Sequence, residues 1–108
     1  MLYDKKWNQE VKVDEVGELL LKAAVVIERR GWCQCRLRTP CGRVCVMGAV
    51  LVAHGEDIET PFYDHPYWLD KAMGRIQNVT NRWPPEWNDQ GGRTAEEVVS
   101  VLRQAAYT

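Results

Sequence analysis

The chain contains no long uninterrupted run of hydrophobic residues. A membrane-spanning helix needs about 18 consecutive apolar residues, and no stretch of this 108-residue sequence approaches that length. No contact with a membrane is therefore expected. The first residues carry charges that no apolar segment follows, which argues against a secretory signal. We accordingly predict a cytoplasmic protein, whose thiols remain reduced.

Excess charge of either sign is also missing. The 14 Lys and Arg residues and the 15 Asp and Glu residues leave a formal net charge of −1. Because nucleic-acid-binding domains are usually basic overall, no nucleic-acid partner is expected. The alternative is a local basic patch around the cysteines, although we interpret its residues as an ordinary solvated surface. They are Arg29, Arg30, Arg36, Arg38 and Arg43.

Hydrophobic periodicity predicts an all-α protein, a small single domain of about four helices with long connecting loops. It spans residues 1–108, of which residues 1–13 form an irregular N-terminal lead-in. The expected helices cover residues 14–30, 43–54, 66–78 and the stretch from residue 94 onward. The loops between them are longer than is usual in a helical bundle, and long loops of this kind are often functional.

Local signals define several helix ends. The first helix has an N-cap at Asp14 and a left-handed C-cap at Gly31. Its charged stripe is narrow, so we expect other helices to surround it as the central helix. The second helix is apolar nearly all round and is expected to be buried, with Gly48 allowing a neighbouring helix to approach closely. The last helix opens with a capping box formed by Thr94 and Glu97.

The four cysteines lie close together in the sequence, as Cys33, Cys35, Cys41 and Cys45. Structural zinc is usually bound by two cysteine pairs, each separated by two to four residues. Only one residue separates Cys33 from Cys35, which gives poor geometry for such a pair. We therefore predict no metal and no cofactor, with a four-cysteine zinc site as the alternative.

A cysteine nucleophile is the second chemical hypothesis. Cys45 is predicted near a helix start, two residues after Arg43, where the pKa of a thiol is lowered. Its base would come from elsewhere in the chain, because His54 falls on the opposite side of the same helix. His65 and Asp89 are the remaining candidates. No complete set of nucleophile, base and orienting residue is visible, so we predict no catalytic residues and no enzyme.

The loop before the last helix carries the predicted contact surface. Two prolines and two glycines exclude regular structure in it, and Pro84 and Pro85 stiffen an aromatic knob that either packs on the core or meets a partner protein. Asp89 is expected to pin this loop by capping it or by pairing with Arg93 or Arg43. An anion held at the following helix start is the alternative. The predicted binding residues are Trp83, Trp87, Asn88, Asp89 and Arg93.

Three strings of residues resemble a family of small proteins of unknown function from actinobacteria and their phages, mycobacteriophages included. The strings are Arg30-Gly-Trp-Cys-Gln34, Gly42-Arg-Val-Cys-Val-Met-Gly-Ala-Val50 and Trp87-Asn-Asp-Gln-Gly-Gly-Arg-Thr-Ala-Glu-Glu-Val98. The resemblance covers most of residues 14–106. It implies an intracellular setting, the host cytoplasm for a phage protein, and it implies no activity.

The same resemblance separates the cysteines into two groups. Cys33 and Cys45 match the family pattern, which implies a buried pair that ties the turn after the first helix to the second helix. Cys35 stands where glycine is common in the family, and Cys41 lies in a variable loop. The residues expected to be structural are Trp32, Cys33, Cys45, Gly48, Thr94 and Glu97.

From these observations we predict a small intracellular binding or regulatory protein of bacterial or phage origin. It acts by contact with a protein partner rather than by catalysis. The alternative is a metal-binding or thiol-dependent protein, with a zinc site or a cysteine nucleophile centred on Cys33 and Cys45.

Overall fold

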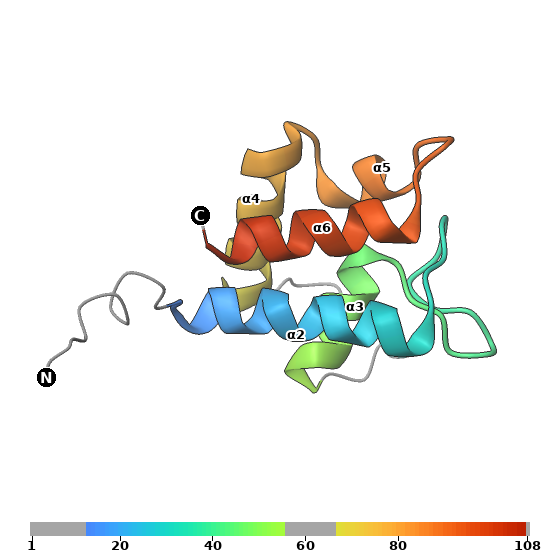
Figure 1. Ribbon diagram of the computed structural model, residues 1–108, viewed down its shortest axis with the longest axis horizontal. Helices are drawn as coiled ribbons and strands as arrows, with labels where there is room; N and C mark the ends of the chain where they lie inside the picture. The colour runs from blue at the N-terminus through green and yellow to red at the C-terminus, as the bar shows by residue number, and fades with distance from the viewer. Residues whose placement is uncertain (1–12, 56–66, 108) are drawn as a thin grey trace, which may run out of the picture.

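Helices make up the regular structure in the part of the chain that the computed structural model describes, residues 13–55 and 67–107 (Figure 1). They are α2 (Glu15–Arg30), α3 (Val46–His54), α4 (Tyr67–Thr80), α5 (Pro84–Asn88) and α6 (Ala95–Ala106). No β-strand is formed within these residues, which confirms the predicted all-α class. None of these helices has the length and apolar character needed to cross a membrane. Most of the predicted lead-in, together with Pro66 and His65, lies outside the described residues.

Helix α2 is the central helix, as predicted. It begins after Asp14, whose side chain accepts a hydrogen bond from the Gly17 N–H at 2.8 Å. The same carboxylate pairs with Arg75 of α4, and this hydrogen bond lowers the pKa of Asp14 below its ordinary value. The helix ends at Gly31, where φ is 96°, a conformation that glycine adopts at little cost. Its buried side packs against α3, α4 and α6.

Helices α2 and α6 lie side by side (Figure 1). The predicted capping box begins α6, because Thr94 Oγ1 accepts a hydrogen bond from the Glu97 N–H and the Glu97 carboxylate accepts one from the Thr94 N–H. A Cβ at Gly17 would lie 2.4 Å from the Ala106 carbonyl oxygen, so glycine permits the close approach of these two helices. The largest fully buried side chains of the core include Leu20, Leu51, Leu69, Met73, Ile76 and Leu102.

Helix α3 begins three residues later than predicted. Residues 43–45 precede it as extended backbone, because Val44 pairs with the backbone at Trp32 on one side and at Arg38 on the other. The helix begins after Cys45, whose Sγ accepts a hydrogen bond at 3.3 Å from the third amide of the helix. A thiol is a weak acceptor, and cysteine is not among the residues that usually cap helices. The sequence therefore contains no usual N-cap residue that would locate the start of α3.

The close approach predicted at Gly48 is present, but the neighbour is not a helix. A Cβ at this position would lie 2.2 Å from the carbonyl oxygen of Leu37. That carbonyl accepts a hydrogen bond from the Cys45 N–H at 3.2 Å, so the irregular backbone between α2 and α3 folds back onto the start of α3. Gly48 thus helps to position residues 31–45, which we call the connecting segment.

The loop predicted between α4 and α6 contains the short helix α5, so the prediction that its prolines exclude regular structure was wrong. Pro84 and Pro85 occupy the first two positions of α5. A residue there makes no intrahelical hydrogen bond through its N–H, and the fixed φ of proline suits the first turn. The prolines therefore start a helix whose last two residues, Trp87 and Asn88, are buried.

Replacing Gly48 with alanine should destabilise the chain by about 1–3 kcal/mol, because the new methyl group must displace the Leu37 carbonyl. Gly74→Ala is the matched control, since a Cβ at this other helical glycine meets no atom within 4 Å. The control should stabilise the chain by up to about 1 kcal/mol, because alanine is the better helix former. Urea denaturation followed by circular dichroism measures both effects. A Gly48→Ala midpoint at or above that of the wild type would contradict the prediction.

Candidate functional site

The side chain of Asn88, the last residue of α5, is completely buried. Its Oδ1 accepts hydrogen bonds from the Trp32 indole Nε1–H at 2.7 Å and from the Val46 N–H at 3.0 Å. Its Nδ2 donates to the Cys33 carbonyl oxygen at 3.1 Å and to Asp89 Oδ1 at 3.0 Å. The two donors and two acceptors of the amide are therefore all used. One side chain joins α5 to the connecting segment and to the first residue of α3.

Residues next to Asn88 extend the same contact. Gln34 Nε2 donates to the carbonyl oxygens of Asn88 at 3.0 Å and of Gln90 at 2.9 Å. Asp89 Oδ1 accepts a hydrogen bond from the Cys35 N–H at 2.8 Å. Cys35 has a φ of 69°, in the left-handed region that favours glycine, which agrees with the glycine that the resemblance implies at this position. We call these hydrogen bonds, together with those of the Asn88 side chain, the Asn88 contact.

Trp87 also points into the protein, with 6% of its surface exposed. The Arg93 guanidinium lies 4.1 Å from the centre of its ring, and Arg93 Nε donates to the Trp87 carbonyl oxygen at 3.1 Å. Arg93 also pairs with Glu97 at 3.5 Å and bonds to Gln90 Oε1. The polar groups at the start of α6 therefore bind one another. This geometry does not favour the alternative prediction of an anion bound at the start of α6.

Burial changes the interpretation of the predicted binding residues. Trp87 and Asn88 are buried, and their side chains contact other parts of the chain. Trp83, the residue before α5, remains accessible, with 36% of its surface exposed. The two tryptophans that flank the prolines thus differ in exposure, and Trp83 is the more accessible of the two.

Asp89 holds the loop in place, as predicted, but its hydrogen-bond partners differ from those expected. We expected this residue to cap the loop or to pair with Arg93 or Arg43. Its carboxylate instead accepts hydrogen bonds from the Cys35 N–H and the Asn88 side chain. The negative charge of Asp89 is directed at a backbone amide, so it does not pair with either arginine.

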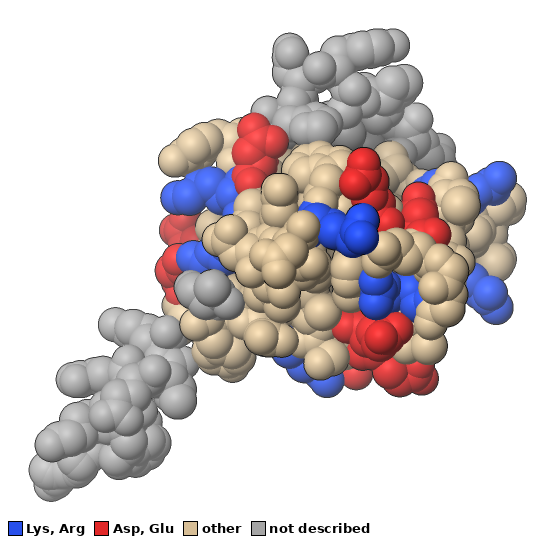
Figure 2. Space-filling model, turned by 90° about the horizontal axis from the view of Figure 1, so that it is seen from above, with Lys and Arg blue, Asp and Glu red and all other residues tan. Residues whose placement is uncertain are grey.

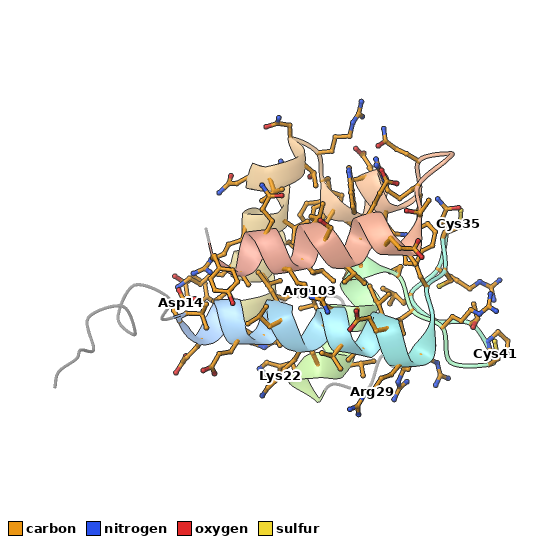
Figure 3. All side chains as sticks on the ribbon, in the orientation of Figure 1. Asp14, Lys22, Arg29, Cys35, Cys41 and Arg103 are labelled. Atoms are coloured by element: carbon orange, nitrogen blue, oxygen red, sulfur yellow. The ribbon has the colours of Figure 1, made fainter. Side chains whose placement is uncertain are left out.

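The four cysteines are free thiols in two different environments. Cys33 and Cys45 are buried, whereas Cys35 and Cys41 are exposed and lie apart from each other on the connecting segment (Figure 3). Within the described parts of the chain, no three His, Cys, Asp or Glu side chains are grouped as metal ligands. The alternative of a four-cysteine zinc site is therefore not formed there.

The buried thiols are also poorly suited to act as nucleophiles. Desolvation raises the pKa of Cys45 to about 11 and raises the pKa of Cys33 as well, so both remain protonated at neutral pH. The Cys33 thiol donates a hydrogen bond to the Arg36 carbonyl oxygen at 3.4 Å, so it is engaged in a contact within the fold. His54 ends α3 and stacks on Trp68, with the ring centroids 3.7 Å apart. The geometry therefore favours a structural role for Cys33 and Cys45.

Five arginines gather at the end of α2 and along the connecting segment. Residues 29–43 contain no acidic residue. Four of the five arginines have exposed side chains, and Arg38 is half-buried. Basic side chains project from the right-hand end of the molecule in Figure 2, the end at which Figure 1 places the connecting segment. We call this the arginine surface, formed by Arg29, Arg30, Arg36, Arg38 and Arg43.

These features define a small all-α domain in which a buried asparagine positions an arginine-rich segment. Residues 11–108 match the model of a family described as Family of unknown function (DUF6197), and the chain belongs to this family. Membership of a family of unknown function was expected from the sequence and is confirmed. No curated protein and no solved structure matches the chain.

Replacing Asn88 with alanine should lower the free energy of unfolding by about 3 kcal/mol or more. The cause is that the indole of Trp32, the amide of Val46 and the carbonyl of Cys33 lose a hydrogen-bond partner. Asn78→Ala, at an exposed position of α4, is the matched control and should change this free energy by less than about 0.5 kcal/mol. Guanidinium denaturation measures both variants. Equal stability of the two would show that the Asn88 contact does not hold the fold.

Proposed function

We propose that this chain is a binding protein that acts by contact with another macromolecule, and that its partner is an acidic protein. The observation that carries the proposal is the arginine surface. An intracellular setting, in an actinobacterium or one of its phages, is part of the proposal and rests on the resemblance described above.

The first support concerns the four exposed residues of the arginine surface, Arg29, Arg30, Arg36 and Arg43. Its four exposed arginines form no ion pair with any acidic residue that the structure describes. Nearby carboxylates are occupied elsewhere, since Glu28 pairs with Arg103 at 2.9 Å and Asp89 accepts the Cys35 N–H. An unneutralised group of like charges attracts a partner of the opposite charge.

The second support is that the backbone beneath these arginines is ordered. The Val44 N–H donates to the Gly31 carbonyl oxygen at 3.1 Å, and the Cys33 N–H donates to the Val44 carbonyl oxygen at 3.0 Å. The turn at the tip is closed by the Thr39 N–H, which donates to the Arg43 carbonyl oxygen at 2.8 Å. Because the segment is ordered before binding, association does not have to order it, which lowers the entropic cost.

The chemistry of the partner follows from the guanidinium group, which binds carboxylates and phosphates through paired N–H donors. We favour carboxylates because the chain as a whole carries a formal charge of −1, so the attraction for an anion is confined to the arginine surface and does not extend along a uniformly charged polymer. A protein can place its carboxylates opposite the arginines alone.

A fluorescence anisotropy titration tests the proposal, with a labelled Glu/Asp-rich peptide as the probe and a labelled DNA duplex in parallel. The wild-type chain should bind the peptide at low ionic strength. The double variant Arg36→Glu/Arg43→Glu should bind it at least about tenfold more weakly, because attraction at two positions becomes repulsion. Arg82→Glu, at an exposed position outside the arginine surface, is the matched control and should change the affinity by about twofold or less.

Three results would overturn the proposal. The first is peptide binding that the double charge reversal leaves unchanged. The second is binding of the duplex alone, which would make a nucleic acid the partner. The third is the absence of binding to either probe.

A further inference from the structure

An open groove of about 670 Å³ lies between α2 and α6. Its floor is apolar and contains Ile27 and Val99, which are 2% and 8% exposed. A volume of this size falls in the range of small-molecule sites, so it leaves ample room for one apolar side chain. The remaining lining residues are Glu28, Gly31, Ala95, Glu96, Ser100 and Arg103.

The groove and the arginine surface meet at Gly31. A Cβ at this glycine would lie 3.0 Å from Cγ of Arg43 and 3.5 Å from its Nε, so the Arg43 side chain lies beside Gly31, next to this end of the groove. At the other end, Arg103 reaches from α6 to Glu28 of α2 and forms an ion pair at 2.9 Å (Figure 3). One end of the groove therefore adjoins the arginine surface and the other end carries an ion pair, with an apolar floor between them.

We propose that this groove receives an apolar side chain from the same acidic protein whose carboxylates contact the arginine surface. The inference rests on the proposed function and names the chemistry of the partner. The partner segment carries an apolar residue, which packs on the floor of the groove, next to a group of carboxylates, which lies toward Gly31 and Arg43. Attraction between these carboxylates and the arginine surface at the Gly31 end of the groove sets the direction in which the partner segment lies.

The rim of the groove favours a peptide over a nucleic acid. Glu28 and Glu96 both line it, and both have exposed side chains. A nucleic acid carries a phosphate at every nucleotide, so a strand that entered the groove would bring phosphates close to the carboxylate of Glu96, whereas Glu28 is paired with Arg103. A peptide avoids this repulsion because it places its apolar residue between the two glutamates and its acidic residues beyond Gly31.

Two labelled peptides with the same acidic residues test the inference, one with leucine beside the acidic group and one with serine at that position. The wild-type chain should bind the leucine peptide at least about tenfold more tightly, because one additional apolar side chain leaves water. Ala95→Phe, at the first position of α6, and Ser100→Trp, at an exposed rim position, each fill the groove. Gln77→Phe, on the exposed side of α4, is the matched control.

Both groove-filling variants should reduce the advantage of the leucine peptide to about twofold or less and leave the affinity for the serine peptide unchanged. Gln77→Phe should keep the full advantage. Equal affinity of the wild type for the two peptides would overturn the inference, as would an advantage that survives both groove-filling variants. The proposed function would still stand if charge reversal at Arg36 and Arg43 weakened binding of the serine peptide. Failure of the wild type to bind either peptide would overturn both proposals.

Discussion

The four hydrogen bonds of the Asn88 side chain are the constraint on which the arrangement of the connecting segment depends. Burial makes a polar group costly when it is unpaired, and a fully satisfied buried amide correspondingly specifies the positions of its partners. Oδ1 and Nδ2 together fix the indole of Trp32, the carbonyl of Cys33 and the first amide of α3 relative to α5. Displacing any one of these groups leaves a buried donor or acceptor without a partner. The connecting segment, and the arginines that it carries, are held in place by this requirement.

The helices form the framework of the domain, and the connecting segment carries most of the arginine surface. Packing of α2 against α6 forms the framework, and its close approach at Gly17 leaves an apolar groove toward the opposite end of the pair. The arginine surface lies next to that groove because α2 ends at Gly31, where the chain turns into the connecting segment. Asp89 and Glu28 are engaged in contacts within the chain, which leaves the exposed arginines available. These arrangements are the physical basis of the proposed acidic, partly apolar partner.

Local sequence signals predicted the features that form within one or two helical turns. The caps at Asp14 and Thr94 located the starts of α2 and α6, whereas the start of α3 was misplaced because a cysteine thiol caps it. The Asn88 contact was beyond prediction, since two of its partners are 42 and 56 residues away in the sequence and no periodicity or turn signal records such a pairing. The sequence alone therefore left open whether the loop before α6 packs on the core or meets a partner. The groove likewise exists only after α2 and α6 have packed.

Exchange of the tryptophan indole N–H groups with solvent, measured by NMR, tests the Asn88 contact most directly. The Trp32 Nε1–H is donated to the buried Asn88 Oδ1, an acceptor that it shares with the Val46 N–H. We predict that the Trp32 indole exchanges much more slowly than the indole of the exposed Trp83, and that the Trp32 indole and the Val46 amide become accessible in the same opening event. Exchange of the Trp32 indole as fast as that of Trp83 would contradict the account.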